Sequence, residues 1–195
     1  MSSGRPGVVA LAGPNGAGKS TAGPALLRDL LGIREFVNAD VIARGLSAFD
    51  PERAALAAGR AMISRVRDLA ARKASFAFET TLAGRGYAPW IGRLVSSGYE
   101  FNIVYLWLPS VDMALDRVAN RVRLGGHRVP TEVVRRRYAA GLRNFFRLYR
   151  PLAASWRFYD GSAGLLPKRI ASGGRRQTEH VADRVLWERI SKEWK

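Results

Sequence analysis

The stretch GPNGAGKST, Gly13 to Thr21, decides the fold that this sequence predicts. It lies between a short apolar strand, Val8 to Ala12, and a helix expected to begin at Lys19. In this context the spacing G-x-x-x-x-G-K-[ST] indicates a turn whose backbone N–H groups surround phosphate oxygens. The residues predicted to bind a nucleoside triphosphate are Gly13, Pro14, Asn15, Gly16, Ala17, Gly18, Lys19, Ser20 and Thr21.

Two side chains of this loop have predicted chemical roles. Lys19 is expected to reach the outer phosphates, and the hydroxyl of Ser20 is expected to hold Mg²⁺. The N-terminus of the following helix adds a partial positive charge. The motif alone does not say what happens to the terminal phosphate.

Short apolar strands alternate with helical segments along the rest of the chain. Further strands are expected to end near Asn38, Glu79 and Pro109, and a fifth covers WRFYDGS at 156–162. This alternation favours a parallel sheet covered by helices on both faces. The tail is expected to hold a short hairpin or irregular piece around LLPKRIASGG and a last helix near 180–191. Because no repeat or linker interrupts the chain, residues 1–195 are interpreted as a single domain.

The composition restricts the classes of protein to be considered. The chain has 195 residues, with 32 Lys or Arg against 16 Asp or Glu, and a formal net charge of +16. This surplus suits nucleic acid, an acidic membrane or a polyanionic small substrate, and it also suits a generally basic solvated surface. The absence of cysteine excludes disulfides and thiolate metal sites. The N-terminal segment lacks a secretory layout and no apolar run approaches a membrane span, so we expect a soluble cytoplasmic protein.

The bound nucleotide could drive work, operate a switch or donate a phosphate. The segment IASGGRRQ at 170–177 resembles the signature of transporter-type ATPases but precedes a polar helix, and we interpret it as a basic loop. A GTP-dependent switch needs a guanine-reading Asn-Lys-x-Asp, which the sequence lacks. Transfer to a small molecule needs a base near the acceptor hydroxyl and cations around the moving phosphoryl group, and the sequence offers both.

Charged residues follow the expected strands at the edge where such sheets hold their ligands. Asp40 comes after the second strand and Glu79 ends the third. Arg117 and Arg121 are four residues apart and share a helix face. Two glycines then give a hinge that could close Arg128 over the phosphates.

Each of these residues also has a structural alternative. Asp40 could be only the N-cap of a helix that begins VIARGL. Glu79 could be only an acidic residue on the Mg²⁺ side of the site. Any of the arginines could belong to the solvated face of a helix.

The same segments carry a resemblance to a known family. The sequence resembles the zeta toxins and their relatives, whose toxins phosphorylate UDP-N-acetylglucosamine, and it looks like their compact stand-alone branch of predicted ATPases. The resemblance extends over roughly residues 8–162. The segments that carry it are AGPNGAGKST, VNADVIA, SAFDPERAA, FAFETTLAGRGY, YLWLPS, RVANRVRLGGHRVP, RRRYAAGLRNFFRLYRPLA and WRFYDGS.

The resemblance implies a fold, a reaction and partners. The fold is an adenylate-kinase-like P-loop NTPase with three α/β/α layers and a five-stranded, mainly parallel sheet in the order 2-3-1-4-5. The reaction is phosphate transfer from ATP, with Mg²⁺, to a nucleotide sugar such as UDP-N-acetylglucosamine. An antitoxin protein is implied as a further partner.

The resemblance also assigns roles to individual residues. Asp40 becomes the base that takes the proton of the acceptor hydroxyl. Arg128, together with either Arg121 or Arg117, clamps the transferring phosphate. The substrate pocket that it implies contains Glu79, Thr80 and Thr81.

The rival interpretation is a nucleic-acid-associated ATPase or binding module that uses the net charge. It predicts ATP hydrolysis stimulated by DNA or RNA, and binding that weakens steeply with salt. No basic motif with base-stacking aromatics stands out, because core packing explains the positions of Trp90, Trp107, Phe145, Phe146 and Tyr149, so we expect no nucleic-acid partner. We expect no membrane partner either.

Overall fold

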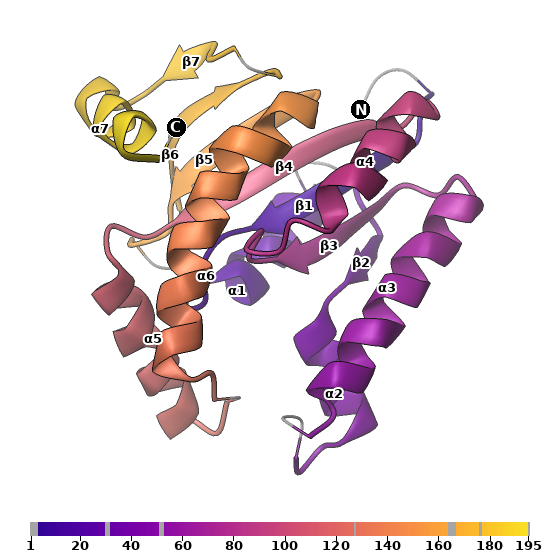
Figure 1. The fold of residues 1–195 in the computed structure, drawn as a ribbon, viewed down its shortest axis with the longest axis vertical. Helices are drawn as coiled ribbons and strands as arrows, with labels where there is room; N and C mark the ends of the chain where they lie inside the picture. The colour runs from indigo at the N-terminus through magenta and orange to yellow at the C-terminus, as the bar shows by residue number, and fades with distance from the viewer. Residues whose placement is uncertain are drawn as a thin grey trace.

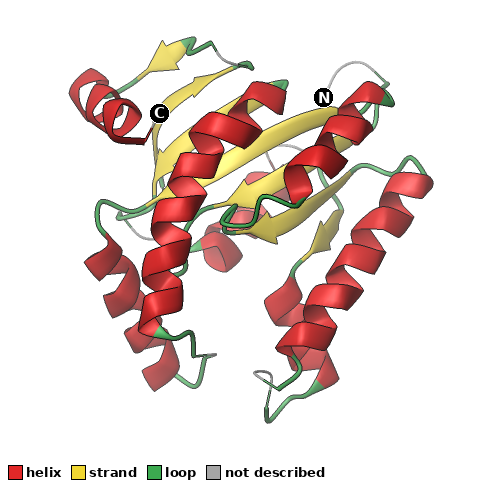
Figure 2. Cartoon of the chain, viewed as in Figure 1, coloured by secondary structure: helices red, strands yellow, loops and turns green. Residues whose placement is uncertain are grey.

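Strands and helices alternate along the chain and build one sheet flanked by helices (Figures 1 and 2). The computed structural model describes residues 4–29, 32–50, 53–126, 128–163, 167–175 and 177–194. The strands are β1 (Gly7–Ala12), β2 (Glu35–Val37), β3 (Phe76–Thr80), β4 (Glu100–Trp107), β5 (Ser155–Asp160), β6 (Lys168–Gly173) and β7 (His180–Val181). The helices are α1 (Lys19–Pro24), α2 (Ala39–Leu46), α3 (Ala55–Ala71), α4 (Tyr87–Ser96), α5 (Val111–Arg123), α6 (Thr131–Asn144) and α7 (Arg184–Trp194).

The central strand β1 carries the phosphate loop to the carboxyl edge of the sheet. It pairs in parallel with β3 and β4, so that Val8 aligns with Phe76 on one side and Phe101 on the other. All six residues of β1 are buried, as expected for a strand covered on both faces. Helices α4 and α6 cover one face of the sheet, and α1 lies behind the other (Figure 1). The carboxyl ends of β1 and β3 therefore lie side by side at the same edge of the sheet.

The prediction of five strands was wrong, because the sheet has seven in the order β2-β3-β1-β4-β5-β6-β7. Its parallel part is β2-β3-β1-β4-β5, and β6 and β7 are added antiparallel beyond β5. The segment interpreted as a basic loop thus begins as strand, with Ala171 opposite Phe158. Short antiparallel edge strands of mixed polarity lack the apolar run that identifies a buried parallel strand.

Aromatic side chains attach the C-terminal helix α7 to the core. Trp187 of α7 stacks on Trp156 of β5, with ring centroids 5.3 Å apart, and also packs on Phe146. Further in, Tyr105 of β4 stacks on Phe158 at 4.9 Å. The core residues form one continuous hydrophobic cluster. None of the helices within the described ranges combines the length and apolar composition needed to cross a membrane.

Candidate active site

A cavity of about 240 Å³ opens where β1 and β3 end and α1 begins. Its walls come from the phosphate loop, the first turn of α2, the end of β3 and one face of α5. Four segments distant in sequence therefore meet at this cavity. The lining residues are Asn15, Gly16, Ala17, Gly18, Lys19, Ser20, Thr21, Asp40, Glu79, Arg117 and Arg121.

The phosphate loop needs glycine at two positions for steric reasons. Gly13 has φ +140°, and a Cβ there would lie 2.2 Å from the carbonyl oxygen of Leu106. Gly16 has φ +79°, and its Cβ would meet the Ala114 carbonyl oxygen at 2.9 Å. Only glycine combines these backbone angles with such close neighbours. The sequence motif thus fixes a loop that packs tightly against β4 and α5.

Lys19 is buried beneath this loop. Its Nζ donates hydrogen bonds to the carbonyl oxygens of Gly13 (2.9 Å) and Pro14 (2.8 Å), and it lies 3.8 Å from Oε1 of Glu79. Burial lowers the pKa of Lys19 below its usual value of 10.5, and the carboxylates of Glu79 and Asp40 oppose that shift. The ammonium group is therefore held in a site where a phosphate would be a strongly favourable partner.

Glu79 joins the phosphate loop to the end of β2. One carboxylate oxygen, Oε2, accepts hydrogen bonds from Ser20 Oγ (3.1 Å) and from Asn38 Nδ2 (2.6 Å). Ser20 and Glu79 thus present two oxygen donors side by side, which fits Mg²⁺, an ion that takes few protein ligands and completes its shell with phosphate oxygens and water. No cluster of three or more His, Asp or Glu suited to a metal occurs in the described part of the chain.

Asn38, not Asp40, caps α2. The side-chain oxygen of Asn38 accepts hydrogen bonds from the backbone N–H of Asp40 (2.8 Å) and Val41 (3.2 Å). The alternative that Asp40 serves only as the N-cap is therefore wrong. Asp40 lies in the first turn, and its partly exposed side chain faces the cavity.

The two arginines of α5 lie at the cavity in different ways. Arg117 donates to three backbone carbonyl oxygens, those of Gly16 (3.4 Å), Gly161 (2.8 Å) and Ser162 (2.7 Å), and so ties the phosphate loop to the segment after β5. Arg121 lines the same cavity one turn later. Its side chain passes close to Gly126, where a Cβ would lie 2.5 Å from Arg121 Cγ.

Five predicted residues lie outside the lining of this cavity: Gly13 and Pro14, whose carbonyl oxygens accept hydrogen bonds from Lys19, and Thr80, Thr81 and Arg128. Arg128 is exposed on the segment between α5 and α6. The hydroxyls of Thr80 and Thr81 accept hydrogen bonds from the backbone N–H groups of Leu82 (3.0 Å) and Ala83 (3.4 Å). Both threonines thus shape the turn that follows β3.

Sequence reasoning missed Asn38 and an arginine of α6, Arg137. Arg137 shares a helix face with Gly141 and Asn144, at positions i, i+4 and i+7, and that face packs on the turn after β3. The Cβ position of Gly141 lies 2.3 Å from the Thr81 carbonyl oxygen, and Asn144 Nδ2 donates to the Leu82 carbonyl oxygen at 2.8 Å. This i, i+4, i+7 spacing was the signal available in the sequence.

Electrostatics links Arg137 to the cavity. Burial lowers the pKa of its guanidinium, as does Arg136, while the nearby carboxylate of Asp40 works in the opposite direction. Arg137 and Arg121 in turn help to lower the pKa of Lys19. The site therefore concentrates Lys19, Arg121 and Arg137 around Asp40, a charge arrangement that a bound polyphosphate would complement.

The chain is similar in sequence to known proteins. Residues 8–148 match the family described as AAA domain. A protein of Haemophilus influenzae (strain ATCC 51907 / DSM 11121 / KW20 / Rd) is 29% identical over 126 residues, which make up 65% of this chain and 88% of that protein.

Solved structures share the fold at low sequence identity. A chain of the AvrRxo1-ORF1:AvrRxo1-ORF2 complex with sulphate ions gives a TM-score of 0.74 at 18% identity, and the same complex with ATP gives 0.72. The match covers 96% of this chain and 64% of that one, so this chain spans less than two thirds of it. A chain of the PezAT toxin–antitoxin system of Streptococcus pneumoniae gives 0.65 at 15% identity, covering 100% of this chain and 84% of that one. The fold is that of an α/β P-loop NTPase.

Proposed function

The chain belongs to the AAA domain family, and we propose that it is an ATP-dependent kinase that transfers the γ-phosphate to a hydroxyl of a small polyanionic acceptor. One observation carries this proposal. A half-exposed carboxylate, Asp40, faces the same cavity as the phosphate loop, Lys19 and Arg121. A carboxylate opposite a cationic phosphate site suits an acceptor hydroxyl that must lose its proton when it attacks the γ-phosphate.

In the proposed reaction, Asp40 accepts the proton of the acceptor hydroxyl while the hydroxyl oxygen bonds to the γ-phosphorus. The bond from that phosphorus to the β–γ bridging oxygen breaks, and ADP leaves. Lys19, Arg121 and Arg137 neutralise the charge on the phosphoryl oxygens, and they do so most strongly in the transition state. Ser20 and Glu79 would hold Mg²⁺, which supplies charge neutralisation at the β- and γ-phosphates when bound.

Two further residues complete the proposed site. Arg117 is a positioning residue, because its hydrogen bonds go to backbone carbonyls of the phosphate loop and of its neighbour segment. We propose that Arg128 contacts the phosphates from the side opposite the phosphate loop, and that it approaches them only when the substrates are bound. Thr80 and Thr81 would shape the wall that faces the acceptor through the turn they stabilise.

The finer proposal is a kinase of the zeta toxin type whose acceptor is a nucleotide sugar such as UDP-N-acetylglucosamine. It rests on the segments quoted from the sequence, and the fold shared with the PezAT and AvrRxo1 complexes supports it. A protein partner of the antitoxin class belongs to the same proposal.

The test is a transfer assay. Purified protein is incubated with γ-labelled ATP, Mg²⁺ and a panel of nucleotide sugars, sugars and nucleosides, and products are separated from free phosphate. We expect label in one acceptor class and none with the variant Lys19→Ala, checked for native fold by circular dichroism. Label appearing only as free phosphate across the panel would overturn the kinase proposal.

A further inference from the structure

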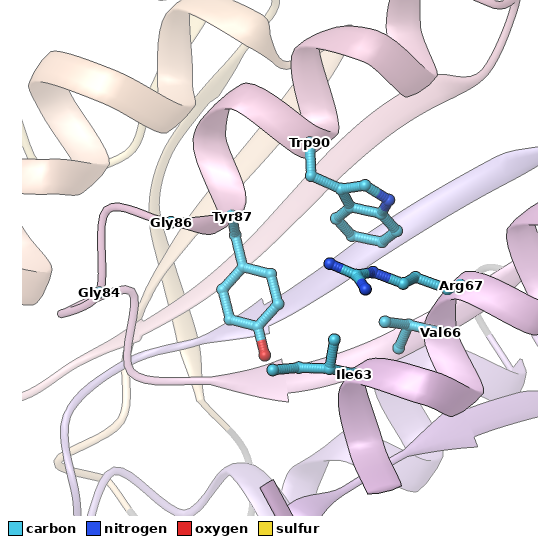
Figure 3. A pocket seen from close by; sticks show the side chains of 7 residues that line it. All are labelled: Ile63, Val66, Arg67, Gly84, Gly86, Tyr87 and Trp90. Atoms are coloured by element: carbon cyan, nitrogen blue, oxygen red, sulfur yellow. The ribbon is translucent and has the colours of Figure 1, made fainter. Parts of the chain in front are cut away.

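A second cavity, of about 350 Å³, lies between α3 and α4 (Figure 3). Its size falls in the range of small-molecule sites, at the lower end. The residues that line it are Ile63, Val66, Arg67, Gly84, Gly86, Tyr87 and Trp90. None of them belongs to the catalytic cavity, and all but the two glycines bring a side chain into the space.

One wall of this cavity is a rigid aromatic surface. Tyr87 and Trp90 are three residues apart on α4, with ring centroids 6.2 Å apart. Both rings also pack on Phe78 of β3, at 5.3 Å and 6.3 Å. The two rings are inclined to each other by 59°, so they form a preformed aromatic corner, supported by a buried strand, in which a planar ligand can stack on one ring and meet the other at its edge.

The opposite wall presents a cation. Figure 3 shows the side chain of Arg67 extending from α3 toward the space between Tyr87 and Trp90. Within the described ranges its guanidinium makes no hydrogen bond or ion pair, and the residue is exposed. By contrast, Arg65, two residues earlier on α3, pairs with Glu35 and Asp68. An anionic group held over the rings would give Arg67 the partner that the described residues do not provide.

Chain connectivity joins this cavity to the catalytic one. Glu79, at the end of β3, lines the catalytic cavity, and the turn that follows it contributes Gly84 and Gly86 to the second cavity. The other wall, α3, follows and packs on α2, the helix that carries Asp40. One wall therefore follows β3 and the other follows α2, and both of these elements line the catalytic cavity at the carboxyl ends of the strands, where such sheets bind ligands.

We propose that the α3–α4 cavity binds the part of the acceptor remote from the phosphorylated hydroxyl, a planar ring that carries an anionic group. The ring stacks on Trp90 with Tyr87 at its edge, and the anion pairs with Arg67. This inference rests on the proposed kinase function for its link to catalysis, but the binding itself does not. A nucleotide, with its base and phosphates, has the required chemistry.

Binding can be measured at the site itself by fluorine NMR. The protein has five tryptophans, so 5-fluorotryptophan labelling gives five resonances, and Trp90→Phe identifies the one from Trp90. The probes are two matched pairs that differ in charge, uridine 5′-monophosphate with uridine and salicylate with salicylamide. We expect the anions to shift the Trp90 resonance saturably and the neutral partners to bind at least about tenfold more weakly, as loss of one charged hydrogen bond predicts.

Two variants make the result decisive. Arg67→Gln should remove the difference between anion and neutral partner. Arg93→Gln, an exposed arginine on α4 outside the cavity, should preserve it. A Trp90 resonance that does not move, or that responds equally in Arg67→Gln and in the unaltered protein, would overturn the proposed site.

The link to catalysis has its own readout. In the transfer assay, Arg67→Gln should raise the acceptor KM at least about tenfold and leave kcat and the ATP KM unchanged, as expected for an interaction made equally in ground and transition states. An unchanged acceptor KM with active transfer would overturn the acceptor role of the cavity. Absence of any transfer together with an intact Trp90 response would instead overturn the kinase function.

Discussion

At Asp40, one substitution can remove a charge and leave the helix cap in place. Asn38 caps α2, so Asp40→Asn takes nothing from the cap and keeps the size of the side chain. The amide cannot accept the hydroxyl proton, and general-base help is worth ~10²–10⁴ in rate, so transfer should fall by about that factor. ATP affinity, measured by calorimetry on the same preparation, should barely change. Wild-type transfer in this variant would return Asp40 to a structural role.

Arg137 has a matched control next to it in the sequence. Arg137→Gln removes a half-buried guanidinium near Asp40 and Lys19, whereas Arg136→Gln removes an exposed one. A charged hydrogen bond to a phosphoryl oxygen contributes about 1.5–3 kcal/mol, so Arg137→Gln should lower kcat/KM roughly 10- to 100-fold. Arg136→Gln should stay within about twofold of the parent. Equal losses in the two variants would assign the effect to general surface charge.

Because Lys19 is buried, we predict that the affinity for ATP depends on pH. Burial lowers its pKa, and a bound triphosphate favours the protonated form, so above the lowered pKa binding must take up a proton. Affinity for a non-hydrolysable ATP analogue should therefore fall as pH rises through the lowered pKa of Lys19, below the usual lysine value of 10.5. In Lys19→Arg, which keeps its charge in this range, affinity is lower at neutral pH but the decline should be flatter. Parallel declines in both proteins would contradict this assignment.

At the scale of elements, α6 packs closely on the turn after β3 at Gly141. A Cβ on Gly141 would lie 2.3 Å from the Thr81 carbonyl oxygen. Gly141→Ala should therefore destabilise the protein by about 1–3 kcal/mol, the usual cost of overpacking, and should also lower transfer because it displaces Arg137. Gly59→Ala in α3, where a Cβ meets nothing within 4 Å, should stabilise by roughly 0.5–1 kcal/mol. Urea unfolding of both variants gives the comparison.

The elements that the sequence predicts well are those with a local signal. The phosphate loop, β1 and the position of Asp40 after β2 follow from motif and apolar runs alone. By contrast, β6 forms because it pairs with β5, and β7 forms because it pairs with β6, and the composition of these two segments does not predict either pairing. Asn38 was overlooked because its neighbour Asp40 is an equally good cap by propensity, and only the three-dimensional hydrogen bonds distinguish them.

At the scale of the whole molecule, the net charge of +16 overstates the free positive surface. Several arginines have local structural tasks. Arg117 holds backbone carbonyls, and Arg150 is buried, with its guanidinium 4.7 Å from the Trp156 ring and a hydrogen bond to Thr178. Arg65 and Arg72 are paired with the carboxylate of Asp68.

This distribution yields the prediction that separates the kinase from its rival class. Duplex DNA and single-stranded RNA should leave both ATP hydrolysis and phosphate transfer unchanged at about 150 mM salt. Contact of a basic surface with polynucleotide phosphates gives dissociation constants of only roughly 10⁻⁴–10⁻⁶ M at such salt and weakens further as salt rises. Anisotropy of a labelled oligonucleotide measures that binding, and a coupled assay measures turnover on the same samples. Severalfold stimulation of hydrolysis that survives this salt would favour a nucleic-acid-dependent ATPase, because a surface contact without a coupled conformational change has no means of reaching Lys19 beneath its loop.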